Sequence, residues 1–77
     1  MEYRLNFYGP LEELFGAHGT IELQEGIRFA ELREKLTVAF KGLDAYSYTL
    51  AQDGAMKSDE EELSTGAIEV FPPFSGG

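Results

Sequence analysis

The chain has 77 residues, with fourteen Asp or Glu against six Lys or Arg, one His, no Cys and a formal net charge of −8. A chain this short buries only about 60% of the surface that its unfolded form exposes, so we expect one small domain with little room for an enclosed active site. The lack of cysteine excludes disulfides, thiolate metal sites and a cysteine nucleophile, and the acidic balance argues against nucleic acid or an anionic membrane as partner.

The chain begins with a pattern typical of a strand that has one buried face. In residues 2–8, Tyr3, Leu5 and Phe7 alternate with polar residues and with Tyr8, the period of two expected of such a strand. Tyr8 is therefore predicted to point outward. A Gly-Pro pair at positions 9 and 10 ends this strand.

A short helix and a second strand are predicted next. Pro10 suits the first turn of a helix, in which Leu11, Leu14 and Phe15 would face inward. Residues 20–24 alternate again, with Ile21 and Leu23 on one face, and are predicted to form a strand antiparallel to the first.

The main helix is predicted between residues 27 and 40. Phe29, Leu32, Leu36 and Phe40 recur at spacings of three and four, which is the pattern of a helix with one apolar face. Arg28 occupies the position where a capping Ser, Thr or Asp is usual. Gly42 is predicted to be the residue that follows the end of this helix.

The remaining elements are strands separated by turns. Residues 46–52 alternate and precede the turn signal Asp53-Gly54, which predicts a third strand and a short hairpin partner at residues 55–57. The acidic run 58–62 has no apolar anchor and is interpreted as a solvated loop, after which Leu63 returns to the core. Residues 67–71 are predicted to form the last strand, with its apolar side chains inward and Phe71 outward.

This order of elements predicts an α+β fold. Two strands, a long helix and two or more further strands favour a mixed sheet with one main helix packed on one face, the ubiquitin-like β-grasp arrangement. The first and last strands would be central. Residues 1–77 would form a single β-grasp domain with a flexible C-terminal tail from about residue 72 to residue 77.

The tail carries a resemblance to a known family. The ending Val70-Phe71-Pro72-Pro73-Phe74-Ser75-Gly76-Gly77 resembles that of the small, sulfur-carrying subunit of molybdopterin synthase, which ends in an aromatic residue, two prolines, two variable residues and Gly-Gly. The likeness extends to the Leu14-Phe15-Gly16 turn, to residues 29–32 of the helix and to the Leu63-x-x-Gly66 turn. Arg28 and Ala67 depart from the family, which often has a Thr cap and an acidic residue there.

The resemblance implies a carrier rather than an enzyme. In that family the C-terminal carboxylate, here that of Gly77, is adenylated by an ATP-using enzyme similar to the ubiquitin-activating type. Sulfur then replaces AMP, and the thiocarboxylate serves the large catalytic subunit in building the dithiolene of molybdopterin. The expected partners are therefore this large subunit, the activating adenylyltransferase and a sulfur donor. No cofactor is expected to be bound, since ATP is used by the partner.

The residue types of the tail suit delivery of a carboxylate into another protein's site. Pro72 and Pro73 hold the chain extended through their fixed φ, and neither can pair as an interior strand. Gly76 and Gly77 present no side chain to a narrow channel. Residues 72–77, which include Phe74 and Ser75, are thus the predicted insertion segment, with Gly77 as the reacting residue.

Exposed aromatic residues are predicted to anchor the partner. Tyr8, Phe71 and Phe74 would form one apolar patch where the tail leaves the sheet. Truncating a central anchor of an interface typically weakens binding by about 2 kcal/mol or more. The acidic surface would speed encounter with basic partners.

Other side chains give weaker signals. His18 has no second His, Cys or clustered acid at ligand spacing and is interpreted as a surface turn residue rather than a metal ligand or general base. The acidic run lacks the spacing of a calcium loop, so no metal site is expected. No apolar run approaches the roughly 20 residues that cross a bilayer, and no signal peptide is recognisable. The cytoplasm is the expected compartment.

Several functions stay open at this point. The sulfur could serve the thiamine thiazole, another metabolite or tRNA instead of molybdopterin. The chain could also be a ubiquitin-like modifier that is joined through Gly77 to a lysine of a target. A third possibility is an interaction domain with an inert tail, which predicts that removing Gly77 changes nothing.

Overall fold

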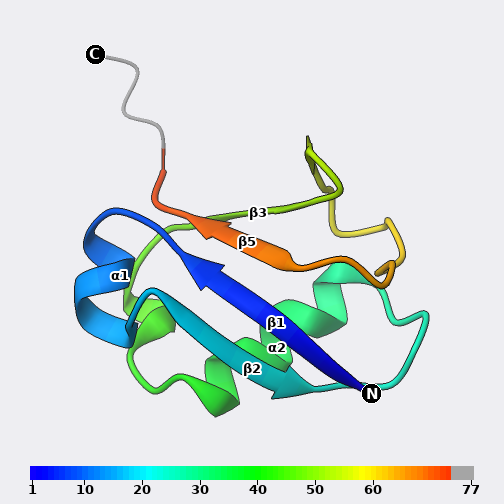
Figure 1. The fold of residues 1–77 in the computed structure, drawn as a ribbon, viewed down its shortest axis with the longest axis horizontal. Coiled ribbons are helices and arrows are strands. Elements are labelled where there is room, and N and C mark those ends of the chain that lie inside the picture. The colour runs from blue at the N-terminus through cyan, green and yellow to red at the C-terminus, as the bar shows by residue number, and fades with distance from the viewer. Residues whose placement is uncertain (74–77) are drawn as a thin grey trace.

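A computed structural model describes residues 1–73 and contains one five-stranded sheet crossed by a long helix (Figure 1). The elements in chain order are β1 (Glu2–Phe7), α1 (Pro10–Phe15), β2 (His18–Glu22), α2 (Phe29–Ala39), the 3-10 helix η1 (Leu43–Ala45), β3 (Thr49–Gln52), β4 (Ala55–Met56) and β5 (Ile68–Phe71). None of the helices in this part of the chain is long and apolar enough to cross a membrane.

The strand order places the two ends of the sequence side by side. The sheet runs β2-β1-β5-β3-β4, with β1 parallel to β5 and antiparallel to β2. β3 pairs antiparallel with both β5 and β4. The first and last strands are therefore neighbours in the middle of a mixed sheet, which confirms the predicted ubiquitin-like β-grasp fold.

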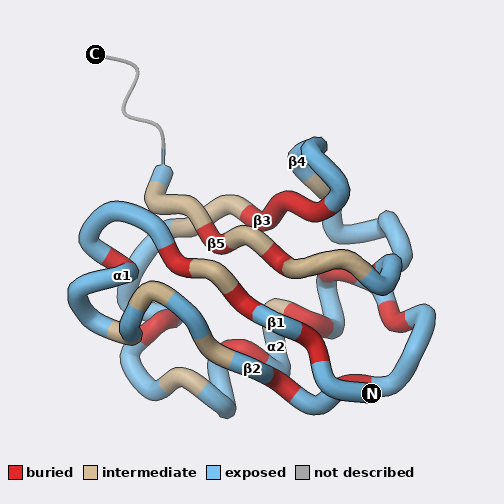
Figure 2. Tube along the Cα trace, viewed as in Figure 1, coloured by how far each residue is buried: buried red, intermediate tan, exposed pale blue. Residues whose placement is uncertain are grey.

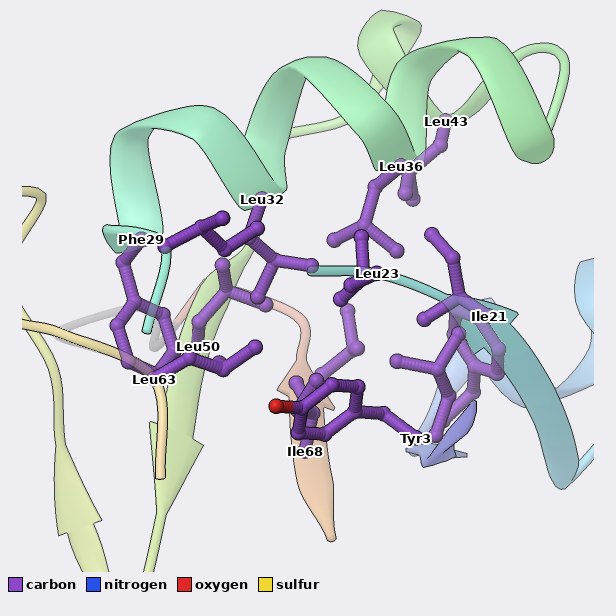
Figure 3. Close-up of a cluster of buried hydrophobic side chains, with 14 of the residues drawn as sticks. Tyr3, Ile21, Leu23, Phe29, Leu32, Leu36, Leu43, Leu50, Leu63 and Ile68 are labelled. Carbon is purple, nitrogen blue, oxygen red and sulfur yellow. The ribbon is translucent and has the colours of Figure 1, made fainter. Parts of the chain in front are cut away.

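The core lies between the sheet and α2. Phe29, Leu32 and Leu36 point from α2 toward the side chains of the sheet (Figure 3), and all three are fully buried. The inward phases of β1 and β5 are also buried, as their alternation predicted, and Leu63 returns to this core. The buried side chains that the sheet contributes include Tyr3, Leu5, Phe7, Ile21, Leu50, Ile68 and Val70.

Two predictions at the start of the chain are wrong. Leu14 is 52% exposed, because α1 has only six residues and Leu11 is the side chain that it buries. Phe15 packs at the edge of the core. His18 lies in β2 and not in a turn, since the strand begins two residues earlier than its alternation suggested. Its Nδ1 lies 2.8 Å from Asn6 Oδ1 on the neighbouring strand.

The ends of other elements also differ from the predictions. β3 begins at Thr49, because residues 43–45 form η1 and the chain reaches the sheet only after Tyr48. β4 has two residues, joined to β3 by Asp53 and Gly54, both at positive φ. The helix α2 starts at Phe29 without a side-chain cap, and Arg28 instead donates from its guanidinium to the carbonyl oxygen of Glu60.

One buried polar side chain was not predicted. Gln52 at the end of β3 is fully buried. Its Nε2 donates to the carbonyl oxygens of Ser64 (2.9 Å) and Gly66 (2.7 Å), and its Oε1 accepts from the Ser64 N–H (2.8 Å). Gln52 thus fixes the turn that leads into β5, the strand from which the tail emerges.

Candidate functional site

The sheet face opposite α2 carries a pair of aromatic rings where the chain leaves β5. The last parallel pair of the central strands is Phe7 with Val70, and both side chains point into the core. Side chains alternate along a strand, so Tyr8 and Phe71 point to the other face. Their rings stack with centroids 4.6 Å apart and an interplanar angle of 10°. Tyr8 is 37% exposed and Phe71 is half-buried.

Glu69 ties this ring pair to β5. The Tyr8 hydroxyl donates to Glu69 Oε2 at 2.6 Å. This hydrogen bond to the carboxylate raises the pKa of Tyr8 above its ordinary 10.0, and both burial of the ring and the negative charge of Glu69 act in the same direction. The phenol is therefore neutral throughout the physiological range, and a negative charge lies at the edge of an apolar surface.

A shallow hollow of about 380 Å³ adjoins the two rings. Its other walls are Glu69 of β5 and the β3–β4 hairpin, whose side chains here are apolar, with Met56 48% exposed. We call this surface the aromatic face, and it consists of Tyr8, Ala51, Ala55, Met56, Glu69 and Phe71. Such a surface accommodates an apolar side chain of a partner, and Glu69 offers a carboxylate to a neighbouring cation.

The described chain ends beside this face. β5 alternates between buried and half-buried residues, and Pro73 beyond it is exposed (Figure 2). Pro72 and Pro73 form no strand, as expected of residues without a backbone donor. The other predicted tail residues, Phe74, Ser75, Gly76 and Gly77, lie outside the described residues, so the structure brings together Tyr8 and Phe71 from the predicted anchor set.

Some residues of the aromatic face were missed by sequence reasoning. Glu69 and Met56 contribute to it only because β5 lies between β1 and β3, a strand order that periodicity does not reveal. The signal for Glu69 was its phase, since it alternates with Ile68 and Val70 and so shares a face with Phe71. Within residues 1–73, no group of three or more His, Asp or Glu side chains is placed to hold a metal ion.

The fold matches solved structures of small proteins over nearly their whole length. A putative molybdopterin converting factor, subunit 1, from Pyrococcus furiosus aligns with a TM-score of 0.81 and 24% identity, covering 96% of this chain and 99% of that one. SAMP1 from Haloferax volcanii aligns with a TM-score of 0.78 and 17% identity over the full length of both chains. A structure of H. volcanii small archaeal modifier protein 1 aligns with a TM-score of 0.78 and 14% identity, covering 95% of this chain and 98% of that one.

These comparisons establish the fold. No protein-family model matches the sequence, and no curated protein matches it. The solved structures confirm that the chain has the β-grasp fold, and one of them carries the name of the molybdopterin system that the tail resembles. At these identities the likeness concerns the architecture alone.

Proposed function

We propose that this protein is a sulfur carrier that acts through the carboxylate of Gly77 as the small subunit of molybdopterin synthase. The observation that carries the proposal is the place where the described chain leaves β5. The chain leaves the central strand β5 through Pro72 and Pro73 directly beside the aromatic face. A partner that binds this face would therefore also bind the segment that ends in Gly76-Gly77.

The solved structures with a similar fold also support the sulfur-carrier role. The P. furiosus protein is described as subunit 1 of a putative molybdopterin converting factor, a name that fits a small subunit with a larger partner. The tail residues of this chain match the family ending that was recognised in the sequence. A domain of this size has little room for an enclosed active site, so it would act by presenting its own terminus rather than by enclosing a substrate.

The proposed chemistry has two steps. In the first, a carboxylate oxygen of Gly77 attacks the α-phosphate of ATP bound to the activating partner, which gives an acyl-adenylate and releases pyrophosphate. In the second, a hydrosulfide supplied by the sulfur donor attacks the acyl carbon. The carbon–oxygen bond to AMP breaks, AMP leaves and a proton is released from sulfur, so that Gly77 ends in a thiocarboxylate. The carrier itself supplies no catalytic side chain to either step.

Intact mass measurement tests the carrier role. The protein is incubated with ATP, an activating enzyme and a sulfide source, and its mass is compared before and after. The proposal expects Gly77 to be the last residue. It expects the protein mass to increase by the difference between one sulfur and one oxygen atom, and the change to map to Gly77. An unchanged mass with an activating enzyme that modifies its own carrier in parallel would refute it. Deleting Gly77 should abolish the change and leave the unfolding temperature unaltered.

Truncation of the rings tests the proposed partner surface. Tyr8→Ala or Phe71→Ala should weaken binding to the large subunit by about 2 kcal/mol, close to 30-fold in Kd. Val38→Ala is the matched control, because Val38 is 81% exposed on α2, the helix on the opposite side of the sheet. Equal Kd values for all three variants would show that the large subunit binds elsewhere.

A second candidate function is protein modification, which is favoured by the two structures of the H. volcanii modifier protein. The activation step would be the same, but a lysine amine of a target would attack the acyl carbon instead of sulfur. Adducts that contain an isopeptide bond to Gly77 and vanish when Gly77 is deleted would support this function. Their absence from cells that contain the thiocarboxylate would leave sulfur transfer as the function.

A further inference from the structure

The pairing between the two central strands continues past their last ladder residues. Beyond Phe7 and Val70, the Tyr8 N–H donates to the carbonyl oxygen of Val70 at 3.2 Å. The Tyr8 and Phe71 rings then stack, and Gly9 comes next to Pro72. A Cβ placed on Gly9 would lie 3.0 Å from Pro72 Cγ and 3.6 Å from Cδ, so the proline ring rests directly on the bare Cα of Gly9. Figure 1 shows the chain after β5 beside the turn that joins β1 to α1.

Gly9 also turns the chain out of β1. Its φ of 59° and ψ of −139° lie in a region that only glycine enters readily. This conformation directs Pro10 into α1, and the carbonyl oxygen of Gly9 accepts the first turn's bond from the Glu12 N–H at 3.0 Å. β1 therefore diverges from β5 at the residue on which Pro72 packs.

Gly9 differs from the other positive-φ glycines in what surrounds it. A Cβ on Gly26, Gly42 or Gly54 would meet nothing within 4 Å, and one on Gly16 would meet only the carbonyl oxygen of His18 at 3.8 Å. Gly16 has φ 89° and ψ 161° at the other end of α1, so it shares the backbone strain of a substitution but not the contact with the tail.

We propose that Gly9 is a positioning residue for the tail, because the Pro72 ring packs on its bare Cα and this contact sets the point and direction in which the chain leaves the sheet at Pro72 and Pro73. The proline ring fixes φ near −65°, so a displacement of the ring is passed on to the peptide that follows. Gly77 comes only four positions after Pro73 in the sequence, so the chain between them spans at most about 14 Å. A shift of an ångström at Pro72 therefore displaces the reacting carboxylate relative to a body that is docked through the aromatic face.

The functional consequence rests on the proposed sulfur-carrier role. Adding a methyl group at position 9 should push the Pro72 ring away and lower kcat for thiocarboxylate formation by about 10-fold to 100-fold, the range expected when a reacting group is misplaced by about 1 Å. KM should stay within about 2-fold, since the surface that docks is unchanged. Gly9→Ala is the test variant and Gly16→Ala the control for backbone strain, and the control should keep kcat within about 2-fold.

A double substitution separates positioning from damage to the fold. Pro72→Ala removes Cγ and Cδ, the two closest ring atoms that the added methyl group would meet. Gly9→Ala combined with Pro72→Ala should therefore have a higher kcat than Gly9→Ala alone, a coupling that a merely structural role of Gly9 does not produce. Pro72→Ala by itself leaves the conformation of Gly9 untouched and should lower kcat by a few fold, which keeps the test valid if Gly9→Ala fails to fold.

NMR gives a readout that does not depend on sulfur chemistry. Nuclear Overhauser contacts between the Gly9 α-protons and the Pro72 ring protons are expected in the wild-type protein. Their absence would show that the Pro72 ring does not pack on Gly9. Equal kcat for Gly9→Ala and Gly16→Ala, or a wild-type kcat for Pro72→Ala, would overturn the positioning role. A wild-type protein that shows the NMR contacts but is never thiocarboxylated would instead contradict the proposed function, while the contact between Gly9 and Pro72 would stand.

Discussion

Replacing Gln52 should destabilise the fold more than any exposed glutamine. Gln52 is fully buried at the end of β3 and makes three hydrogen bonds of 2.7–2.9 Å to the backbone of Ser64 and Gly66. Methionine has a similar length and volume, so Gln52→Met removes these bonds and opens little cavity. At about 1 kcal/mol for each bond, the expected loss of unfolding free energy is about 3 kcal/mol.

Chemical and thermal denaturation followed by circular dichroism measures this loss. For a domain of this size, about 3 kcal/mol corresponds to a fall in Tm of roughly 12–24 °C. Hydrogen exchange at the Ser64 amide should accelerate more than exchange at the amides of β1, because the turn before β5 loses its anchor. Gln24→Met is the control, since Gln24 is exposed. A difference between the two variants below about 0.5 kcal/mol would refute the argument that this side chain holds the turn.

Two further outcomes follow from the fold and the aromatic face. Leu11→Ala should lower the unfolding free energy by about 2–5 kcal/mol, because Leu11 is buried, and Leu14→Ala by less than about 0.5 kcal/mol, because Leu14 is 52% exposed. Equal losses of the two variants in urea denaturation would contradict the observed packing of α1. The raised pKa of Tyr8 means that the fold favours its neutral phenol, so this contribution is complete below pH 10.0 and is lost as pH rises through the folded value. An NMR titration should show Tyr8 ionising at a lower pH in Glu69→Gln, and an unchanged midpoint would rule out Glu69 as the cause.

The local pattern of the sequence was sufficient for most elements. Alternation predicted which side chains of β1 and β5 are buried, and spacings of three and four predicted the buried face of α2. Asp53-Gly54 predicted the hairpin. These signals are reliable because each depends on neighbours in the chain and on a fixed repeat of the backbone.

Contacts between distant segments were beyond the reach of that pattern. The burial of Gln52 depends on a turn twelve residues later, and the exposure of Leu14 depends on where a six-residue helix meets the edge of the core. His18 lies in β2 because Asn6 pairs with it across the sheet. In each case the deciding partner is a residue that local periodicity does not specify.

The candidate site divides in the same way. The sequence by itself determined the carrier-like ending, the outward phases of Tyr8 and Phe71 and an acidic chain without cysteine. Only the tertiary structure decided that these two rings stack, that Glu69 binds the Tyr8 hydroxyl and that Pro72 rests on Gly9. The physical reason is the parallel pairing of β1 with β5, which brings residues more than sixty positions apart into contact, and the register of that pairing is set by the core that both strands share.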